Sequence, residues 1–141
     1  MVKPQINEFQ FTKLIVFDLE KTAAFYRDVC GLVELARVEE KIAGRSITEI
    51  VFKGTDGDSL MAAFMLLKFH DAPKPSNSEV MLAYVTNDLV AFLKRVRAAG
   101  GTVAEDVRVI AETGTKVAFV HDVEGHLIEA LEFPRARLEG L

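Results

Sequence analysis

The chain has 141 residues, enough for one domain with a hydrophobic core or for two small modules that share one. Half of the residues are hydrophobic and the formal net charge is -4, which argues against nucleic acid or an anionic membrane as the main partner. The single cysteine, Cys30, excludes an internal disulfide bond and is typical of a reducing compartment. The N-terminal residues lead into polar sequence, and no stretch approaches the ~20 apolar residues of a membrane span. We therefore expect a cytoplasmic protein.

The first half of the chain predicts a strand, a helix and three further strands. Residues 10–17 are rich in β-branched and aromatic side chains, which favours a strand. Asp18 offers an N-cap and Gly31 a stop for a helix whose apolar side chains recur at helical spacing. Tyr26 and Cys30 fall on the buried stripe of that helix, and we interpret both as core residues. The next strands are predicted at residues 32–38, 46–52 and 60–69.

The second half repeats this order after a polar, proline-bearing linker. Residues 80–85 predict a strand, and Asn87 or Asp88 caps a helix that Gly100 and Gly101 end. The remaining strands are predicted at residues 102–110, 115–121 and 127–133. We accordingly divide the chain into a first module (9–70), the linker (71–78), a second module (79–133) and a tail (134–141).

The two helices show an internal repeat. Asp18 recurs as Asp88 and Gly31 as Gly101, both seventy positions later. The repeat predicts an α+β fold of two βαβββ modules. Each module has a helix on one face of its sheet and nothing on the other, so two curved sheets side by side can enclose an apolar trough.

The last predicted hairpin carries a carboxylate within an apolar strand. Its turn is the run from Asp122 to Gly125, and Glu129 follows among the apolar side chains of residues 127–131. Burying a carboxylate without a partner costs free energy. Either this strand lies at an edge where water reaches Glu129, or Glu129 faces the trough.

Several segments together carry a family resemblance. They are Phe17-Asp18-Leu19, Ala24-Phe25-Tyr26, Gly31-Leu32, Ala98-Ala99-Gly100-Gly101 and residues 119–129. The last segment is similar to the Phe-x-x-Asp-Pro-Asp-Gly-x-x-x-Glu signature of the vicinal oxygen chelate superfamily, with Val123 where proline is usual. That superfamily contains glyoxalase I, bleomycin-resistance proteins, fosfomycin-resistance enzymes and extradiol dioxygenases. The resemblance covers nearly the whole chain and implies the paired-module fold, whereas the reaction differs among members.

The resemblance also implies where a metal would bind. Metal-dependent members place one ligand on each of four strands that face the trough, and these positions fall on Phe11, Met65, Val80 and Glu129. Only Glu129 is of a metal-ligand type, and a hard divalent ion requires several oxygen or imidazole ligands. We therefore expect neither the family's metal nor another cofactor, and an apolar ligand pocket in its place.

The three histidines are the residues that could rebuild a metal site. His70 lies five positions from Met65, so strand alternation puts it on the opposite face. In a four-residue turn His121 pairs with His126, and both point away from Glu129, although a β-bulge would reverse this parity. We interpret all three as surface or interface histidines, with displaced ligands at His121 or His126 as the alternative.

The positions in phase with the four family positions are expected to line the trough and contact a ligand. They are Phe11, Lys13, Ile15, Met65, Leu67, Val80, Leu82, Tyr84, Leu127, Glu129 and Leu131. Lys13 and Glu129 are the charged members. They could recognise an anionic ligand; alternatively, they form a salt bridge with each other, or Lys13 extends to the solvent-exposed rim of the trough. In a site without metal, a desolvated Glu129 suits a general base that takes a proton beside a carbonyl group.

The sequence thus predicts a homodimeric protein that binds a small, partly apolar organic molecule, with lyase or isomerase chemistry at Glu129 as the catalytic hypothesis. Two alternatives stay open. One is a metal-dependent lyase or dioxygenase with displaced ligands. The other is a non-catalytic protein that sequesters its ligand, as bleomycin-resistance proteins do. The trough lies within one chain or across a dimer, since relatives of this family do both.

Overall fold

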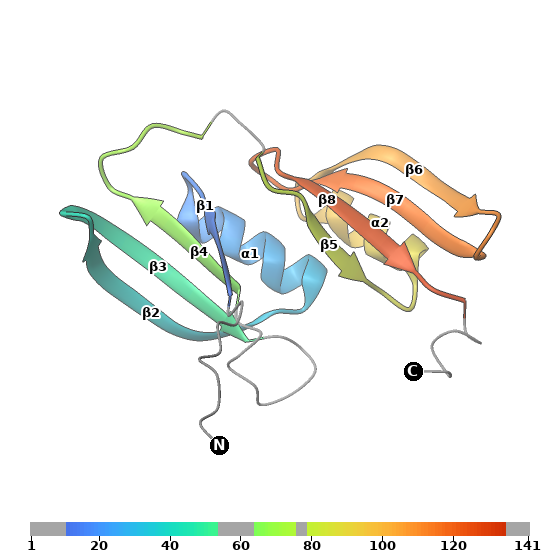
Figure 1. Ribbon diagram of the computed structural model, residues 1–141, viewed down its shortest axis with the longest axis horizontal. Coiled ribbons are helices and arrows are strands. Elements are labelled where there is room, and N and C mark those ends of the chain that lie inside the picture. The colour runs from blue at the N-terminus through green and yellow to red at the C-terminus, as the bar shows by residue number, and fades with distance from the viewer. Residues whose placement is uncertain (1–10, 54–63, 76–78, 135–141) are drawn as a thin grey trace, which may run out of the picture.

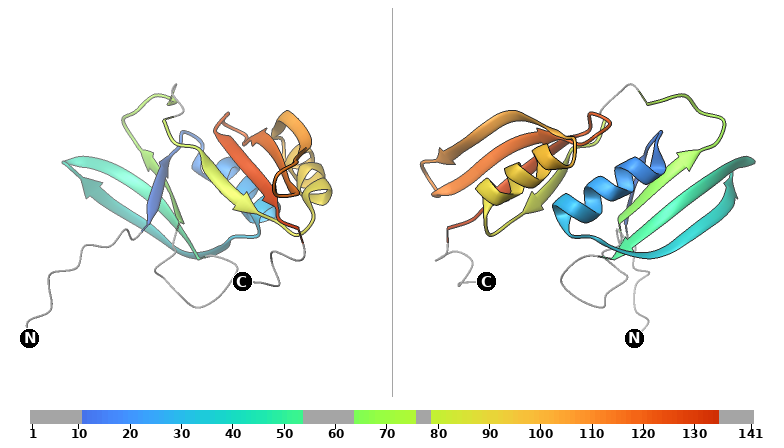
Figure 2. Two further views of the ribbon diagram at one scale, coloured as in Figure 1. Left: turned by 45° about the vertical axis from the view of Figure 1, so that its right-hand side comes forward. Right: turned by 180° about the vertical axis from the view of Figure 1, so that it is seen from behind.

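The computed structural model describes residues 11–53, 64–75 and 79–134. It contains two four-stranded sheets side by side with both helices on the same side, as the front and back views show (Figures 1 and 2). The elements in chain order are β1 (Thr12–Ile15), α1 (Leu19–Cys30), β2 (Val33–Ile42), β3 (Arg45–Lys53), β4 (Phe64–Phe69), β5 (Leu82–Val85), α2 (Leu89–Ala98), β6 (Thr102–Ile110), β7 (Thr115–His121) and β8 (Leu127–Glu132).

The two sheets have the same topology. The strand order is β1-β4-β3-β2 in the first sheet and β5-β8-β7-β6 in the second. In each sheet the first strand of the module runs parallel to the last, and the other pairs are antiparallel. This arrangement confirms the predicted α+β fold of two βαβββ modules.

Both helices begin as the sequence predicts. The backbone N–H of Lys21 donates to Asp18 Oδ1 at 3.0 Å, and the N–H of Ala91 donates to Asp88 Oδ1 at 3.0 Å. These bonds satisfy donors that a helix N-terminus otherwise leaves free. Gly101 is required for a different reason: a Cβ atom there would lie 2.5 Å from the carbonyl oxygen of His121. The end of α2 can therefore pack closely against β7.

One hydrophobic core joins the two modules. The helix α1 packs against α2 as well as against β3 and β4. The ring of Tyr26, which is fully buried, lies 5.3 Å from the ring of Phe64 and 6.4 Å from that of Tyr84, so it contacts both sheets. The Arg95 guanidinium donates to the carbonyl oxygen of Val29 at 3.2 Å between the two helices. Tyr26 is a core residue, as predicted.

Strand boundaries differ from the predictions mainly at exposed ends. The strand β2 continues to Ile42, four residues past its predicted end, because exposed charged residues there still pair with β3 in an edge strand. The strand β1 is shorter than predicted, and residues 60–63 of the predicted fourth strand lie outside the described part of the chain. Within the described ranges, no helix is long and apolar enough to cross a membrane.

Candidate functional site

The face of each sheet that points away from α1 and α2, called the helix-free face below, carries most of the predicted ligand-contacting residues. In the first sheet Lys13 pairs with Met65 and Ile15 with Leu67. Paired residues in a sheet point to the same side. Leu66 and Phe52, which alternate with these positions, belong to the core under the helices. The four predicted residues therefore share the helix-free face.

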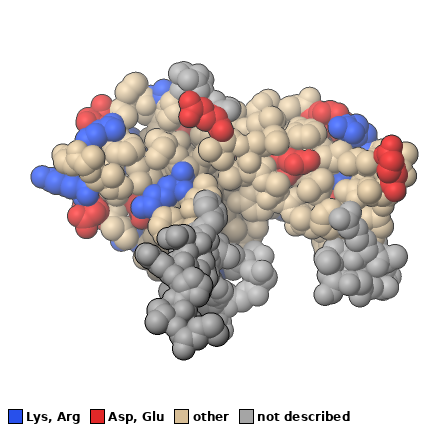
Figure 3. Space-filling view, in the orientation of Figure 1, with Lys and Arg blue, Asp and Glu red and all other residues tan. Residues whose placement is uncertain are grey.

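The second sheet places Glu129 on the corresponding face. Glu129 pairs with Ala83 on β5 and with Phe119 on β7, whereas its neighbours Ile128 and Ala130 are fully buried in the core. Leu127 and Leu131 alternate with the core residues and accompany Glu129. Figure 3, in the orientation of Figure 1, shows that uncharged side chains cover much of this side of the molecule.

Three predicted positions on the fifth strand require correction. Leu82 and Tyr84 pair with Ile128 and Ala130, so they face the helices and pack against the core instead of lining the trough. The predicted phase was counted from Val80, one residue out of step with the register. Ala83 is the residue of this strand that points to the same face as Glu129, and Met81, two residues earlier, points to that face as well. The family metal position of this strand therefore falls on Met81, seventy positions after Phe11, and not on Val80.

Lys13 forms an ion pair with a residue that sequence reasoning did not single out. Its Nζ lies 2.8 Å from Oε2 of Glu49 on β3, and Glu49 is only 6% exposed. The proposed salt bridge between Lys13 and Glu129 is therefore wrong. The signal for Glu49 was present in the sequence, because it is an acidic residue in phase with the apolar Ile47 and Val51 on the helix-free face.

Glu129 is partly buried and lacks a partner among the described residues. Within that part of the chain its carboxylate takes part in no hydrogen bond and no ion pair. The residues beside it on the helix-free face, Phe119 and Ala83, are apolar. Its carboxylate is therefore free to interact with a ligand, and its role as a general base stays a prediction.

The turn between β7 and β8 is longer than predicted, which changes the position of two histidines. His121 pairs with Leu127, so the turn contains all five residues from Asp122 to His126. His121 thus lies on the helix-free face, contrary to the prediction, with its Nδ1 3.3 Å from Thr102 Oγ1. His126 is buried between the two modules, so of the predicted surface or interface positions the surface one is wrong for this residue. His70 contacts Thr48 Oγ1 at 2.7 Å on the opposite face from Glu49, as expected.

Asp122 is the centre of a buried polar network in this turn. Its Oδ2 accepts the hydroxyl proton of Tyr26 at 2.8 Å and lies 2.8 Å from Nδ1 of His126. Its Oδ1 accepts the backbone N–H groups of Glu124 and His126 at 2.8 and 3.0 Å. Because Tyr26 belongs to the first module, Asp122 connects the two modules.

The network shifts the pKa values of Asp122, His126 and Tyr26. Burial acts to raise the pKa of Asp122, but hydrogen bonds from His126 and Tyr26 outweigh it and the pKa lies below its usual value. The hydrogen bond with Asp122 raises the pKa of His126, although burial opposes this, and the backbone of Ile15 on β1 adds a smaller contribution. Burial and the Asp122 charge raise the pKa of Tyr26 far above its usual range. The network therefore favours an ionised Asp122 with a protonated His126.

Glu124 forms a second contact from the same turn to the first module. Its Oε1 accepts the backbone N–H of Phe17 at 2.9 Å and its Oε2 that of Asp18 at 2.5 Å, immediately before α1. A carboxylate is stabilised there by the positive end of the helix dipole. The turn from Asp122 to His126, called the signature turn below, thus binds the backbone at the start of α1.

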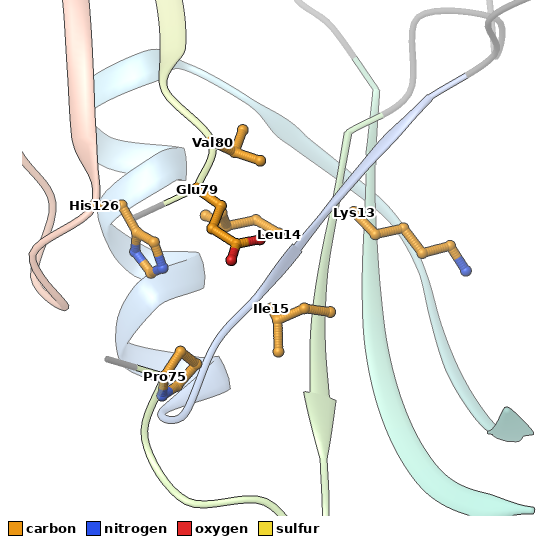
Figure 4. Close-up of a pocket in the computed structure, with 7 residues that line it drawn as sticks. All are labelled: Lys13, Leu14, Ile15, Pro75, Glu79, Val80 and His126. Carbon is orange, nitrogen blue, oxygen red and sulfur yellow. The ribbon is translucent and has the colours of Figure 1, made fainter. Parts of the chain in front are cut away.

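A cavity of about 240 Å³ lies at the junction of the modules, along the edge of β1 that does not pair with β4. It is lined by Lys13, Leu14, Ile15, Pro75, Glu79, Val80 and His126. Figure 4 shows His126 and Glu79 on one side of β1, whereas Lys13 extends to the other side. The cavity brings together three predicted ligand-contacting residues: Lys13, Ile15 and Val80. Glu129, Met65 and Leu67 are not part of its lining.

The residues at the family's metal positions do not fit a divalent ion. Phe11, Met65 and Met81 offer no hard donor, so Glu129 is the single candidate ligand among the four. No three His, Cys, Asp or Glu side chains in the described ranges are grouped so that they could hold a metal. The imidazole of His126 is already hydrogen-bonded to Asp122 and lies outside this set.

Comparisons with known proteins agree with one another. A family model described as Glyoxalase/Bleomycin resistance protein/Dioxygenase superfamily matches residues 5–130. A lactoylglutathione lyase of Haemophilus influenzae is 30% identical over 124 residues, which cover 86% of this chain and 89% of that protein.

Solved structures share the fold. A glyoxalase family protein from Bacillus cereus superposes with a TM-score of 0.78 at 16% identity, over 94% of this chain and 98% of that one. A glyoxalase I mutant from Zea mays gives a TM-score of 0.72 at 22% identity, over 87% of this chain and 45% of that longer one.

Proposed function

This chain belongs to the Glyoxalase/Bleomycin resistance protein/Dioxygenase superfamily, and from that membership we propose that it binds a small, partly apolar organic molecule without a divalent metal. The ligand lies on the helix-free face beside β1, where Lys13 also reaches the junction cavity. Apolar side chains of the first sheet, among them Ile15 and Met65, contact its body.

One observation carries this proposal: the side chains at the family's metal positions. Three of the four are apolar, and the fourth, Glu129, offers a single carboxylate. Phenylalanine and methionine side chains favour contact with carbon atoms of a ligand and do not bind hard cations. The same positions that coordinate an ion in metal-dependent members therefore suit an apolar group here.

Glu129 is the residue that would carry a reaction. A lyase reaction, the kind that the relative's name indicates, or an isomerase reaction would have to rely on side chains of this chain. The carboxylate of Glu129 is partly buried among apolar residues and makes no hydrogen bond within the described ranges. We propose that it takes a proton from a carbon atom beside a carbonyl group of the ligand.

Binding without conversion is the second candidate function. A general base is usually oriented by a hydrogen bond from another residue, and the described part of the chain supplies none to Glu129. The Asp122–His126 pair, which could assist proton transfer, is instead used at the module junction. This arrangement favours a protein that sequesters its ligand.

Metal content and turnover test the proposal together. We expect elemental analysis of the purified full chain to find no zinc, nickel, iron or manganese near one ion per chain. The reaction followed is the formation of S-lactoylglutathione, because the name of the relative refers to this compound. We expect its formation from methylglyoxal and glutathione to be unaffected by a chelator and by added divalent ions. Metal-restored turnover would refute the metal-free site.

Matched variants separate catalysis from binding. If Glu129 is the base, Glu129→Gln abolishes any metal-independent conversion, whereas Glu112→Gln, on an exposed turn, leaves it unchanged. A ligand that binds both variants and is recovered unaltered from the wild-type chain identifies the sequestering function. The homodimer and the cytoplasmic location stay predictions, which sedimentation and cell fractionation can check.

A further inference from the structure

The Lys13–Glu49 ion pair is incomplete as a hydrogen-bonded unit. The ammonium group of Lys13 lies 2.8 Å from Oε2 of Glu49, which neutralises the charge of the carboxylate. Oε2 is nevertheless buried without a hydrogen bond, so the ammonium approaches it outside hydrogen-bond geometry, and Oε1 accepts no hydrogen bond from the described residues either. The side chain of Glu49 is more than nine-tenths buried, whereas that of Lys13 is 32% exposed.

A buried carboxylate in this state has a free-energy cost. Carboxylate oxygens in protein interiors normally accept several hydrogen bonds, and leaving them unsatisfied costs about 1 to 3 kcal/mol. The strand does not need an acid at this position, because Ile47 and Val51 on either side of Glu49 in the same face are apolar. An apolar residue would avoid the desolvation cost of the ion pair. The carboxylate therefore suits a donor that comes from outside the chain.

Lys13 supplies the complementary half of the site. An ammonium group has three N–H donors, and only one can be directed at Glu49. The other contact of its Nζ is with the face of the Phe11 ring, at 5.5 Å from the centroid. The pair thus presents a donor beside an acceptor on the helix-free face, next to the apolar side chain of Met65, which pairs with Lys13.

We propose that the Lys13–Glu49 pair is the polar anchor of the ligand site and recognises a neutral carboxamide at the end of an apolar ligand. The amide N–H donates to Oε1 of Glu49, because Oε2 is enclosed behind the Lys13 ammonium, and the amide oxygen accepts from Lys13. This inference rests on the proposed function, because it names the chemistry of the ligand that binds there. The apolar body of the ligand packs on Met65 and Ile15.

The charges of the pair exclude the simpler polar groups. A carboxylate on the ligand has no donor for Glu49 and would bring a second negative charge against a buried one. An amine would bring a second cation beside Lys13 and offers no acceptor for the N–H groups of Lys13. A primary carboxamide is neutral, and one of its two N–H donors lies beside its carbonyl oxygen, which is an acceptor. It therefore satisfies both residues without new charge.

Amide NMR on the full-length, ¹⁵N-labelled chain tests the inference. The probes are benzamide, benzoate, benzylamine and ethylbenzene, which share an aromatic body and differ in the polar group. We expect benzamide to shift the backbone resonances of Lys13, Glu49 and Met65 and to bind about tenfold more tightly than the other three, as a hydrogen bond to a charged group predicts. Equal affinities for benzamide and ethylbenzene would overturn the anchor while leaving apolar binding intact.

A pair of variants gives an independent reading. Glu49→Leu is expected to abolish the preference for benzamide and to keep ethylbenzene binding, whereas Glu112→Leu on an exposed turn keeps the preference. An unchanged preference in folded Glu49→Leu overturns the anchor. If Glu49→Leu does not fold, the comparison of the four probes on the wild-type chain decides. If no probe shifts any residue of the helix-free face, both the anchor and the proposed function are wrong.

Discussion

Replacement of Asp122 by alanine is expected to destabilise the whole fold. Asp122 is 3% exposed and accepts hydrogen bonds from the Tyr26 hydroxyl, from the His126 ring and from the backbone N–H groups of Glu124 and His126. Its removal leaves buried donors without an acceptor, and breaking a buried charged pair typically costs about 3 to 5 kcal/mol. This loss is a large part of the total stability of an ordinary domain.

Urea unfolding followed by circular dichroism measures this effect. The midpoint of the Asp122→Ala variant should fall strongly while the slope of the transition stays the same. Asp106→Ala is the matched control, because exposed Asp106 bonds only the adjacent N–H of Val107 among the described residues, and the stability of this variant should differ from that of the wild type by less than about 0.5 kcal/mol. A loss below about 1 kcal/mol for Asp122→Ala would refute the view that this turn holds the modules together.

Two further predictions concern the same junction, and a third concerns the packing of α2 on β7. Because its folded-state pKa is raised above the ordinary value of 6.5, His126 should stabilise the fold fully below that pH and lose this contribution as the pH rises through the raised pKa. The difference in unfolding free energy between the wild type and His126→Gln should therefore shrink with rising pH, and a constant difference would contradict it. Glu124→Ala should lower stability by about 1 kcal/mol, since two N–H groups before α1 lose their acceptor; calorimetry showing an unchanged melting temperature would contradict this. Gly101→Ala places a Cβ 2.5 Å from the His121 carbonyl and should cost more than about 2 kcal/mol in urea unfolding, whereas Gly44→Ala meets no atom and should cost only about 1 kcal/mol, from the strain of alanine at its φ of +78°.

The signature turn has a structural role in this chain. Asp122 and Glu124, the two acidic residues in the turn of the family motif, contact Tyr26 and the start of α1 in the other module. A motif that defines a family can therefore reflect how two modules are held together. It supports membership more strongly than it supports a reaction.

Local sequence signals determined the architecture. The capping residues Asp18 and Asp88 recur at a spacing of seventy, and β-strand alternation with turn residues located the eight strands of the described ranges. These signals depend on contacts between residues close in the chain, so the sequence alone reveals them. The apolar residues at Phe11 and Met65 were likewise visible without a structure, as was the isolated acid Glu129.

Tertiary structure decided which of these residues meet. The phase of β5 and the length of the β7–β8 turn each depend on pairing with another strand, and an error of one residue moves Leu82, Tyr84 and His121 to the opposite face. The partner of Lys13 is Glu49, thirty-six residues away, because β3 and β4 bring them together. Burial of His126 required the packing of one module on the other, which no local pattern contains.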